Sequence, residues 1–256
     1  MEPLTSRAPR LFCDGVLAGG AAISLSPEQG HYLTGVLRLR PGDPVRLFNG
    51  RDGEWLAYLT EVTKKTVAAR CERTLAAALL PPDLDFLFAP LKHARLDYLV
   101  QKAVELGVRR LRPVITHRTI AGRVNLDRMR ANAIEAAEQC NLTAVPDVLE
   151  PLKLGAVLGD WPVGRVLIHC DETAAAGSPL AALKALALPA AVLAGPEGGF
   201  DEAERALLNR LPFVTAISLG PRILRADTAG VAALTLAQAV LGDWDRSEPP
   251  LHRLID

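Results

Sequence analysis

The first 75 residues carry short stretches in which apolar side chains either run together or alternate with polar ones. A period of two residues is typical of a half-buried β-strand, because successive side chains point to opposite faces. Asn49-Gly50 and Asp52-Gly53 supply the positive φ angles that tight hairpin turns require. We therefore predict a small β-barrel domain over residues 1–75. Its expected strands are Ala21–Ser26, Pro44–Phe48, Trp55–Val62 and Thr66–Cys71.

The periodicity changes after Pro81-Pro82, a pair that interrupts regular structure and places a domain boundary near residues 74–83. Between Leu96 and Val104, apolar residues recur at three- and four-residue spacing, which predicts a buried helix face. Strands and helices then alternate, so residues 76–256 are predicted to form an α/β domain with a mainly parallel sheet. The expected strands are Leu84–Leu91, Leu111–Thr116, Val166–Cys170, Ala190–Ala194 and Phe213–Ser218, and the expected helices are Lys92–Leu106, Leu126–Gln139, Leu180–Leu186, Asp201–Leu211 and Thr228–Leu241. Asp201 and Glu204 have the spacing of a capping box at the start of one helix.

The composition is that of a globular protein, with 49% hydrophobic and 23% charged residues in a chain of 256. No apolar run is long enough to span a membrane, and the N-terminal residues lack the apolar stretch of a signal peptide, so we expect a cytoplasmic protein. The four cysteines form no C-x-x-C pair and the five histidines form no H-E-x-x-H motif. Reduced thiols and no metal site are therefore expected.

Charge is divided unequally along a chain whose net charge is zero. Residues 1–130 contain 20 Lys and Arg against 13 Asp and Glu, a net charge of +7, and the remainder carries −7. Ordinary surface charge is the simpler explanation of such a division when it is taken alone. A basic N-terminal half is nevertheless what a polyanionic partner would require.

Three predicted strands end in loops that are polar or rich in glycine, at residues 169–172, 194–200 and 218–225. In open α/β sheets, ligands bind beyond the carboxyl ends of the strands, and glycine lets a ligand approach the backbone. Turns and helix caps would explain any one of these loops, but three consecutive strand ends predict a ligand pocket. Ile223 and Leu224 would form walls for a flat apolar group such as adenine. The usual dinucleotide and nucleoside-triphosphate glycine motifs are absent from the sequence.

Several segments together resemble a known family. They are Gly195-Pro-Glu-Gly-Gly-Phe200, Leu219-Gly-Pro-Arg-Ile-Leu-Arg225 followed by Ala226-Asp-Thr-Ala229, and Glu138-Gln-Cys140 with Val145-Pro146. In this combination they closely resemble the RsmE family of the SPOUT class, which methylates 16S ribosomal RNA at uracil N3. The stretch from His31 to Asp43 is similar to the PUA-like domain of that family. The resemblance covers nearly the whole chain.

The resemblance implies a fold and a cofactor. The fold would be a PUA-like β-barrel followed by a SPOUT-type domain with a trefoil knot, and the cofactor would be S-adenosylmethionine bound in the knot. It also implies a homodimer with the site at the subunit interface, and RNA bound by the PUA-like domain. The implied cofactor-binding residues are Ala194, Gly195, Glu197, Gly198, Gly199, Ser218, Leu219, Gly220, Ile223 and Leu224.

Methylation at uracil N3 requires that the N3 proton leave and that the resulting charge on O2 and O4 be stabilised, so a cationic donor beside the base would help. Arg225 is the first candidate, and Arg118, from the same or the other subunit, is the second. A phosphate contact or a helix-end charge would explain either arginine equally well. Glu197 could act as the base or hold a backbone N–H, and the second, structural role is favoured. Asp227 and Thr228 are expected to cap the last helix. The RNA-binding candidates are Arg7, Arg10, Arg38, Arg40 and Arg123.

The sequence departs from the family pattern at one place. Glu138-Gln139-Cys140 is followed by Asn141-Leu142, where the family pattern often has Gly-Arg, so the arginine that could contact RNA or substrate there is missing. Two other functions stay open. One is a SPOUT ribose 2′-O-methyltransferase, and the other is a non-catalytic RNA-binding or ribosome-assembly protein that has kept the fold. Methyl transfer to a small molecule fits the charge division least.

Overall fold

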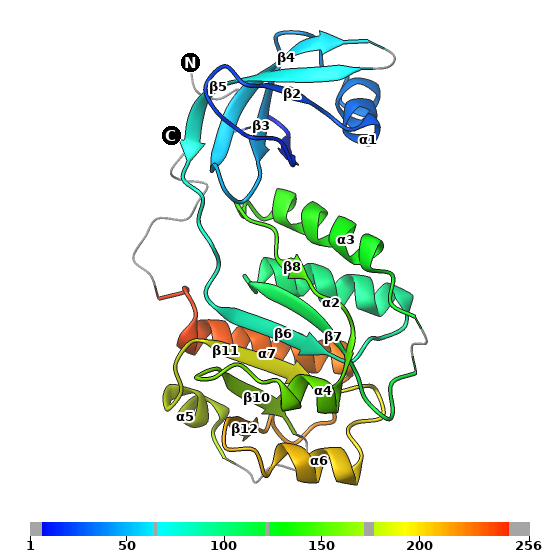
Figure 1. Cartoon of the computed structure of the whole chain (residues 1–256), viewed down its shortest axis with the longest axis vertical. Helices are drawn as coiled ribbons and strands as arrows, with labels where there is room; N and C mark the ends of the chain where they lie inside the picture. The colour runs from blue at the N-terminus through cyan, green and yellow to red at the C-terminus, as the bar shows by residue number, and fades with distance from the viewer. Residues whose placement is uncertain (1–6, 64–65, 121–122, 172–176, 246–256) are drawn as a thin grey trace. The chain divides into compact units, whose positions relative to one another are not determined.

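The computed structural model describes residues 7–63, 66–120, 123–171 and 177–245. By its internal contacts, the chain divides into two units (Figure 1). The first comprises the described residues up to Leu80 together with Ala137–Val145, and the second comprises Pro81–Ala136 and the described residues from Pro146 onward. The sequence predicted two continuous domains, 1–75 and 76–256. It did not predict that Ala137–Val145 belongs to the first unit.

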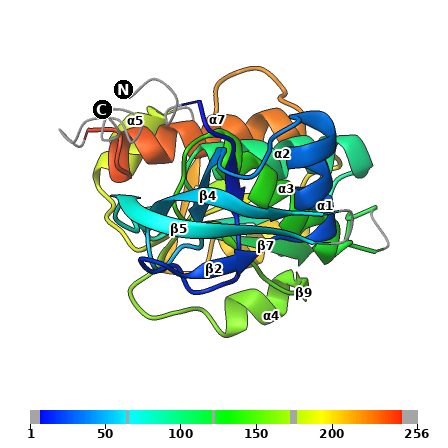
Figure 2. The ribbon, with the colours of Figure 1, turned by 90° about the horizontal axis from the view of Figure 1, so that it is seen from above.

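The first unit is built on a five-stranded sheet with the order β1-β3-β4-β5-β2. β1 and β3 are parallel, and the other neighbours are antiparallel. Figure 2 shows β4, β5 and β2 side by side, as the pairing requires. Four strands coincide with predicted ones, whereas β1 has no counterpart in the sequence prediction. The strands are β1 (Arg10–Phe12), β2 (Ala22–Ser24), β3 (Pro44–Phe48), β4 (Glu54–Val62) and β5 (Val67–Ala76).

A short helix, α1 (Pro27–His31), continues into a π-helical turn, η1 (Tyr32–Val36), between β2 and β3. The sequence prediction did not contain this helix. Ser26 accepts a hydrogen bond from the backbone of Gln29, and the Gln29 side chain accepts one from the backbone of Ser26. This reciprocal capping box satisfies two backbone donors, and Pro27 suits the first helical position because it has no N–H to leave unpaired.

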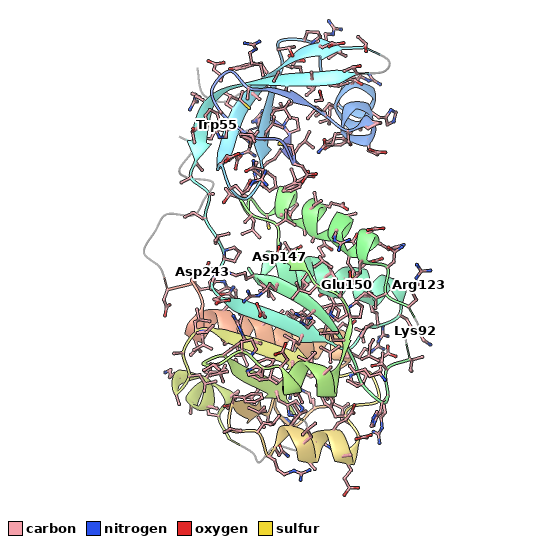
Figure 3. The ribbon with its side chains drawn as sticks, in the orientation of Figure 1. Trp55, Lys92, Arg123, Asp147, Glu150 and Asp243 are labelled. Atoms are coloured by element: carbon pink, nitrogen blue, oxygen red, sulfur yellow. The ribbon has the colours of Figure 1, made fainter. Side chains whose placement is uncertain are left out.

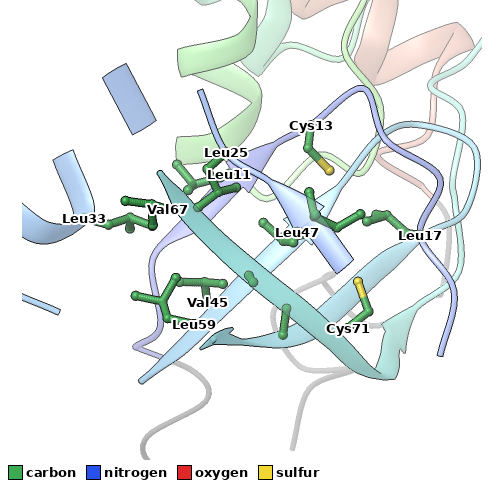
Figure 4. Packing of buried hydrophobic residues seen from close by; sticks show 13 residues of the cluster. Leu11, Cys13, Leu17, Leu25, Leu33, Val45, Leu47, Leu59, Val67 and Cys71 are labelled. Carbon is green, nitrogen blue, oxygen red and sulfur yellow. The ribbon is translucent and has the colours of Figure 1, made fainter. Parts of the chain in front are cut away.

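The core of the first unit is a cluster of aliphatic side chains enclosed by the sheet (Figure 4). Two cysteines, Cys13 and Cys71, lie within it, and burial raises the pKa of both thiols, that of Cys13 to about 11. All four cysteines are free, as the sequence predicted. The aliphatic members labelled in the figure are Leu11, Leu17, Leu25, Leu33, Val45, Leu47, Leu59 and Val67.

Arg10 has a structural position that differs from the expected one. It is 7% exposed, and its Nε lies 3.0 Å from Glu54, which also pairs with Arg46 at 3.3 Å. The rest of its guanidinium donates to the carbonyls of Ala137, Glu138 and Leu142 at the end of a helix. Cations are favourable at a helix C-terminus, where carbonyls lack partners. In this arrangement Arg10 is buried with four of its five N–H groups engaged, and it fixes Ala137–Val145 to the sheet, which corrects its assignment to RNA.

The second unit contains seven strands, all paired in parallel, with the order β12-β10-β11-β6-β7-β8 and with β9 also on β7. The predicted parallel α/β architecture is confirmed. The two short strands β8 and β9 were not predicted. The strands are β6 (Leu84–Phe88), β7 (Arg110–Ile115), β8 (Asp147–Val148), β9 (Leu152–Lys153), β10 (Val166–Cys170), β11 (Ala190–Ala194) and β12 (Val214–Ile217).

Helices cover both faces of this sheet. On one face, Leu158 and Leu208 pack with Leu87 and Leu193 of the strands. On the other, Gly230 lies so close to the sheet that a Cβ there would meet the Phe86 ring at 2.9 Å. No helix of the described residues is long and apolar enough to cross a membrane. The helices are α2 (His93–Glu105), α3 (Leu126–Gln139), α4 (Leu154–Gly159), α5 (Pro179–Lys184), α6 (Glu202–Leu208) and α7 (Ala226–Leu241), of which α4 was not predicted.

Four charged side chains join the amino ends of the strands in the second unit. Arg110 contacts Asp85 at 2.6 Å and Asp83 at 2.5 Å. Arg165 contacts Asp83 at 2.9 Å and Asp85 at 3.3 Å, and it donates to the carbonyl of Ala190. Burial raises the pKa of Asp85, which its two arginine partners oppose. The cluster therefore ties β6, β7, β10 and β11 together at the edge opposite their carboxyl ends.

Candidate functional site

A cavity of about 430 Å³ lies at the carboxyl ends of β10, β11 and β12, against the first turn of α7. Its volume falls in the range of small-molecule sites. Nine predicted site residues line it, and Ala194, Ser218 and Arg118 do not. The predicted residues that line the cavity are Gly195, Glu197, Gly198, Gly199, Leu219, Gly220, Ile223, Leu224 and Arg225.

The glycines of the two loops have different physical reasons for being glycine. A Cβ on Gly195 would lie 2.7 Å from the ring of Phe200, so the close packing of that ring requires glycine. Gly220 has a φ of +99° and nothing within 4 Å of the position of a Cβ. Its conformation requires glycine, and the space beside it is open. Gly199, with a φ of +68°, is also in the left-handed region.

The apolar wall is formed by the loop that follows β12. Ile223 is 91% exposed in the isolated chain, and Leu224 is half-buried. Both border the cavity, together with Pro196 on the other loop.

The end of β10 is more buried than the sequence suggested. His169 belongs to the strand, is fully buried and packs edge-on against Phe200 at 4.9 Å. Burial lowers the pKa of His169 to about 4, so the ring is neutral at pH 7. Burial also raises the pKa of the Cys170 thiol to about 12. Of the predicted polar loop 169–172, only Cys170 and Asp171 line the cavity, and Glu172 lies outside the described residues.

Neither ring nitrogen of His169 has a hydrogen-bond partner among the described residues. Because an unsatisfied buried polar group is destabilising, we expect His169→Leu to raise the free energy of unfolding by about 1–2 kcal/mol at pH 7. Denaturant unfolding measures this change, with the exposed His31→Leu as control. A loss of stability in His169→Leu would contradict the prediction.

The same variant should change the pH dependence of stability. The pKa of His169 in the folded protein, about 4, is below its value of 6.5 in the unfolded chain. As the pH falls from 6.5 towards 4, the unfolded state therefore binds a proton that the folded state does not, and the native protein loses stability. His169→Leu removes this loss, so its advantage over the native chain widens by about 2 kcal/mol at pH 5.

The charged lining is mainly basic, with four arginines against two carboxylates, Asp171 and Glu197. Glu197 forms an ion pair with Arg95 at 3.4 Å. The side chain of Arg225 makes no hydrogen bond or ion pair within the described part of the chain. The arginines are Arg95, Arg205, Arg222 and Arg225.

Sequence reasoning missed several lining residues, among them Arg95, Phe200, Arg205 and Arg222. Arg95 follows the carboxyl end of β6, which is the neighbour of β11, so the rule for strand ends pointed to this segment as well. Arg205 belongs to α6, and no local pattern distinguishes it from a surface arginine. Arg222 lies within the motif of residues 219–225, but no role was predicted for it from the sequence.

Arg118 lies in the turn after β7 and donates from Nη1 to the carbonyl of Gly198 at 2.8 Å. It therefore reaches the loop of residues 194–200, called the glycine loop from here on, without lining the cavity. Asp227 does not cap α7, because Arg225 occupies the N-cap position and Asp227 accepts a hydrogen bond from the backbone of Thr228 in the first turn. This corrects the expected cap.

The other proposed RNA-binding arginines lie at the surface. Arg7, Arg38 and Arg40 are exposed residues of the first unit. Arg123 is exposed in the second, in the segment between β7 and α3 (Figure 3). Arg38 has a φ of +60°, which is uncommon for a residue with a side chain and fixes the chain direction after η1. Their assignment to RNA stays a prediction.

Asn141, which stands where relatives often have glycine, has a φ of +62°. It lies just beyond the end of α3, and asparagine tolerates this left-handed conformation better than most residues. The replacement of glycine therefore leaves the turn after the helix intact. Leu142, where relatives often have arginine, supplies a backbone carbonyl to Arg10.

Two family models match the chain. One, described as an RNA methyltransferase domain, matches residues 79–238, and the other, an RNA methyltransferase PUA domain, matches residues 25–70. Two relatives are named ribosomal RNA small subunit methyltransferase E. The relative from Rickettsia conorii is 29% identical, over 88% of this chain and 93% of its own length. The relative from Synechocystis is 33% identical, over 86% of this chain and 74% of its own length.

Two solved structures are also similar. The ribosomal RNA small subunit methyltransferase E of Neisseria gonorrhoeae, bound to S-adenosylmethionine, has a TM-score of 0.84 and 28% identity, and covers 93% of this chain and all 100% of its own. A methyltransferase from Legionella pneumophila, in complex with the same cofactor, has a TM-score of 0.81 and 31% identity, with coverage of 93% and 99%.

Proposed function

The chain belongs to the RNA methyltransferase family, and we propose that it methylates N3 of a uridine in the 16S ribosomal RNA of the small subunit, with S-adenosylmethionine as cofactor. The observation that carries the proposal is the cavity at the ends of β10, β11 and β12, because nine of the predicted site residues line it together.

The residues present fit S-adenosylmethionine. Gly198, Gly199 and Gly220 leave backbone groups accessible at the rim, and Ile223 and Leu224 offer apolar surface for the adenine. When bound, this cofactor supplies an electrophilic sulfonium methyl group, and no metal is required for its transfer. The glycine loop and the loop after β12 would hold it.

The protein must hold N3 in line with the methyl group and stabilise the charge that the uracil oxygens acquire. We assign the second task to Arg225. It lines the cavity, it has no partner within the described residues, and it stands at the N-terminus of α7, where the helix dipole also favours negative charge. Arg118 is the second candidate, because it already contacts the glycine loop at Gly198.

The remaining parts of the proposal concern partners. Arg7, Arg38 and Arg40 of the PUA-like unit, with Arg123, would contact the phosphates of the RNA. We also propose a homodimer whose interface covers the exposed Ile223, a trefoil knot in the second unit, and a cytoplasmic location, where small ribosomal subunits are found.

The decisive experiment is mass spectrometry of nucleosides from small subunits incubated with the protein and S-adenosylmethionine. The subunits should come from cells that lack the gene. We expect 3-methyluridine. A 2′-O-methylated nucleoside would instead identify a ribose methyltransferase, and the absence of any cofactor binding would favour a non-catalytic RNA-binding protein.

A further inference from the structure

The turn between β7 and α3 is attached to the loop that carries the cofactor glycines. Residues 116–119 form a compact turn, in which the backbone N–H of Thr116 donates to Thr119 Oγ1 at 2.9 Å and the two hydroxyls are also 2.9 Å apart. The backbone of Thr119 returns a hydrogen bond to the carbonyl of Thr116. The turn is therefore a rigid support for the two side chains at its tip, His117 and Arg118.

Three contacts join this turn to residues 198–204, with partners that lie 80 to 87 positions apart in the sequence. Arg118 donates to the carbonyl of Gly198, and its Cδ would lie 3.5 Å from a Cβ at that position. The backbone N–H of His117 donates to Glu204 at 2.9 Å. His117 Nδ1 lies 2.5 Å from an oxygen of Asp201. The turn thus contacts this loop at Gly198 and at its C-terminal end, where α6 is capped.

The contacts on the α6 side surround His117 with negative charge. His117, Asp201 and Glu204 form a compact group. The side chains of Asp201 and Glu204 each accept a hydrogen bond from the backbone N–H of the other, which is the predicted capping box. We therefore assign these carboxylates to the helix cap and not to a metal. The hydrogen bond and the charge of Asp201, together with the charge of Glu204, raise the pKa of His117. Among the described residues, these two carboxylates are the titratable groups that face it, and Arg118 is the charged neighbour on its own turn.

We propose that His117 and Arg118 form a clamp that positions the glycine loop for S-adenosylmethionine, and that the clamp is tighter when His117 is protonated. The inference rests on the proposed function, because it assumes that the loop holds this cofactor. His117 is a positioning residue here, since it acts through Asp201 and Gly198 and does not line the cavity.

The direction of the pH effect follows from the charges. The pKa of His117 is raised in the folded protein, so the additional attraction to Asp201 is fully present below the unfolded pKa of 6.5 and is lost as the pH rises through the folded value. The neutral ring can still donate from Nδ1, so only the ionic part is lost. Because His117 is largely exposed, with 73% of its side chain accessible, the effect is that of a surface ion pair, about two- to fivefold in affinity.

The test measures the dissociation constant of S-adenosylhomocysteine by calorimetry between pH 5.5 and pH 9, for the full-length native protein and His117→Asn. The asparagine amide places a donor where Nδ1 was but carries no charge at any pH. Taking the ratio of the two constants cancels the titration of the ligand itself. We expect His117→Asn to bind about two- to fivefold more weakly at pH 6 and as tightly as the native protein at pH 9.

Asp201→Asn is the matched partner variant. Its single amide oxygen can still cap α6 through the backbone of Glu204, while the charge and the acceptor oxygen that face His117 Nδ1 are removed, and at high pH the neutral ring can accept from the amide instead. It should give the same pH-dependent ratio, and the double variant should bind no more weakly than either single one. His31→Asn, at an exposed histidine of the other unit, should give a ratio of one at every pH. Thermal melting of each variant verifies that it is folded.

A ratio that does not change with pH, in variants that melt like the native protein, would overturn the clamp while leaving the proposed function intact. Additive effects of His117→Asn and Asp201→Asn would overturn it as well. If the native protein binds no S-adenosylhomocysteine at any pH, the proposed function fails and this inference fails with it.

Discussion

We expect Arg225→Ala to lower kcat for RNA methylation by about 10²–10³-fold, while the affinity for S-adenosylhomocysteine changes little. The physical reason is that a donor aimed at developing charge acts mainly in the transition state, and removing one such donor typically costs this much in rate. Single-turnover methylation of small subunits, combined with calorimetry, separates the two quantities. Arg225→Lys, which keeps the charge but not the planar fork, should recover part of the rate.

The matched control is Arg210→Ala, an exposed arginine of the same unit that donates to a carbonyl at the end of α6 and does not line the cavity. It should methylate at the native rate. If Arg225→Ala instead weakens cofactor or RNA binding with kcat unchanged, Arg225 binds the ground state and Arg118 becomes the candidate for charge stabilisation.

Arg165→Ala should lower the free energy of unfolding by about 3–5 kcal/mol, which is the typical effect of removing one partner from a buried ion pair. Arg165 is 8% exposed and contacts both Asp83 and Asp85, so its loss leaves Asp85 buried with Arg110 as its one cationic partner in the described cluster. The carbonyl of Ala190 also loses its donor. Urea unfolding followed by circular dichroism measures the change.

Arg128→Ala is the control for this experiment, because the ion pair of Arg128 with Asp97 is exposed and should contribute little. Arg165→Met tests the mechanism further. It keeps most of the packing volume, so a loss as large as that of Arg165→Ala would assign the effect to charge and hydrogen bonding. Equal stability of Arg165→Ala and Arg128→Ala would contradict the role given to the cluster.

The long, regular elements could be predicted from the sequence because their periodicity is strong. The helix Leu126–Gln139 and the strands Val166–Cys170 and Ala190–Ala194 have the predicted bounds. The elements missed are short, such as β1 with three residues and β8 with two, and such lengths contain too few side chains to define a period. The helix α1 is different, because Ser26, Pro27 and Gln29 form a recognisable start signal that the strand pattern around it obscured.

The candidate site could be predicted where the motifs are local. The two glycine loops line one cavity because strands that are parallel present their carboxyl ends at the same edge. Arg205 could not be found in this way, since only the packing of α6 against the sheet brings it to the cavity, whereas Arg95 lies in the segment after β6 to which the same rule points. Arg10 and His169 were misjudged for a related reason. Arg10 is too buried to contact a phosphate, and His169 is too buried to contact solvent. The burial of a residue depends on the whole fold and not on the local sequence.

The return of Ala137–Val145 to the first unit has a consequence for how the protein is made and divided. Arg10 is synthesised long before its partner carbonyls, the separation from Ala137 being 127 residues. On the ribosome, the buried guanidinium of Arg10 therefore lacks these carbonyl acceptors until the segment up to Val145 has been synthesised. A fragment that ends at Leu80 would lack those carbonyls permanently. Anyone who transplants this unit onto another enzyme must carry two separate pieces of chain, so it is not an exchangeable module.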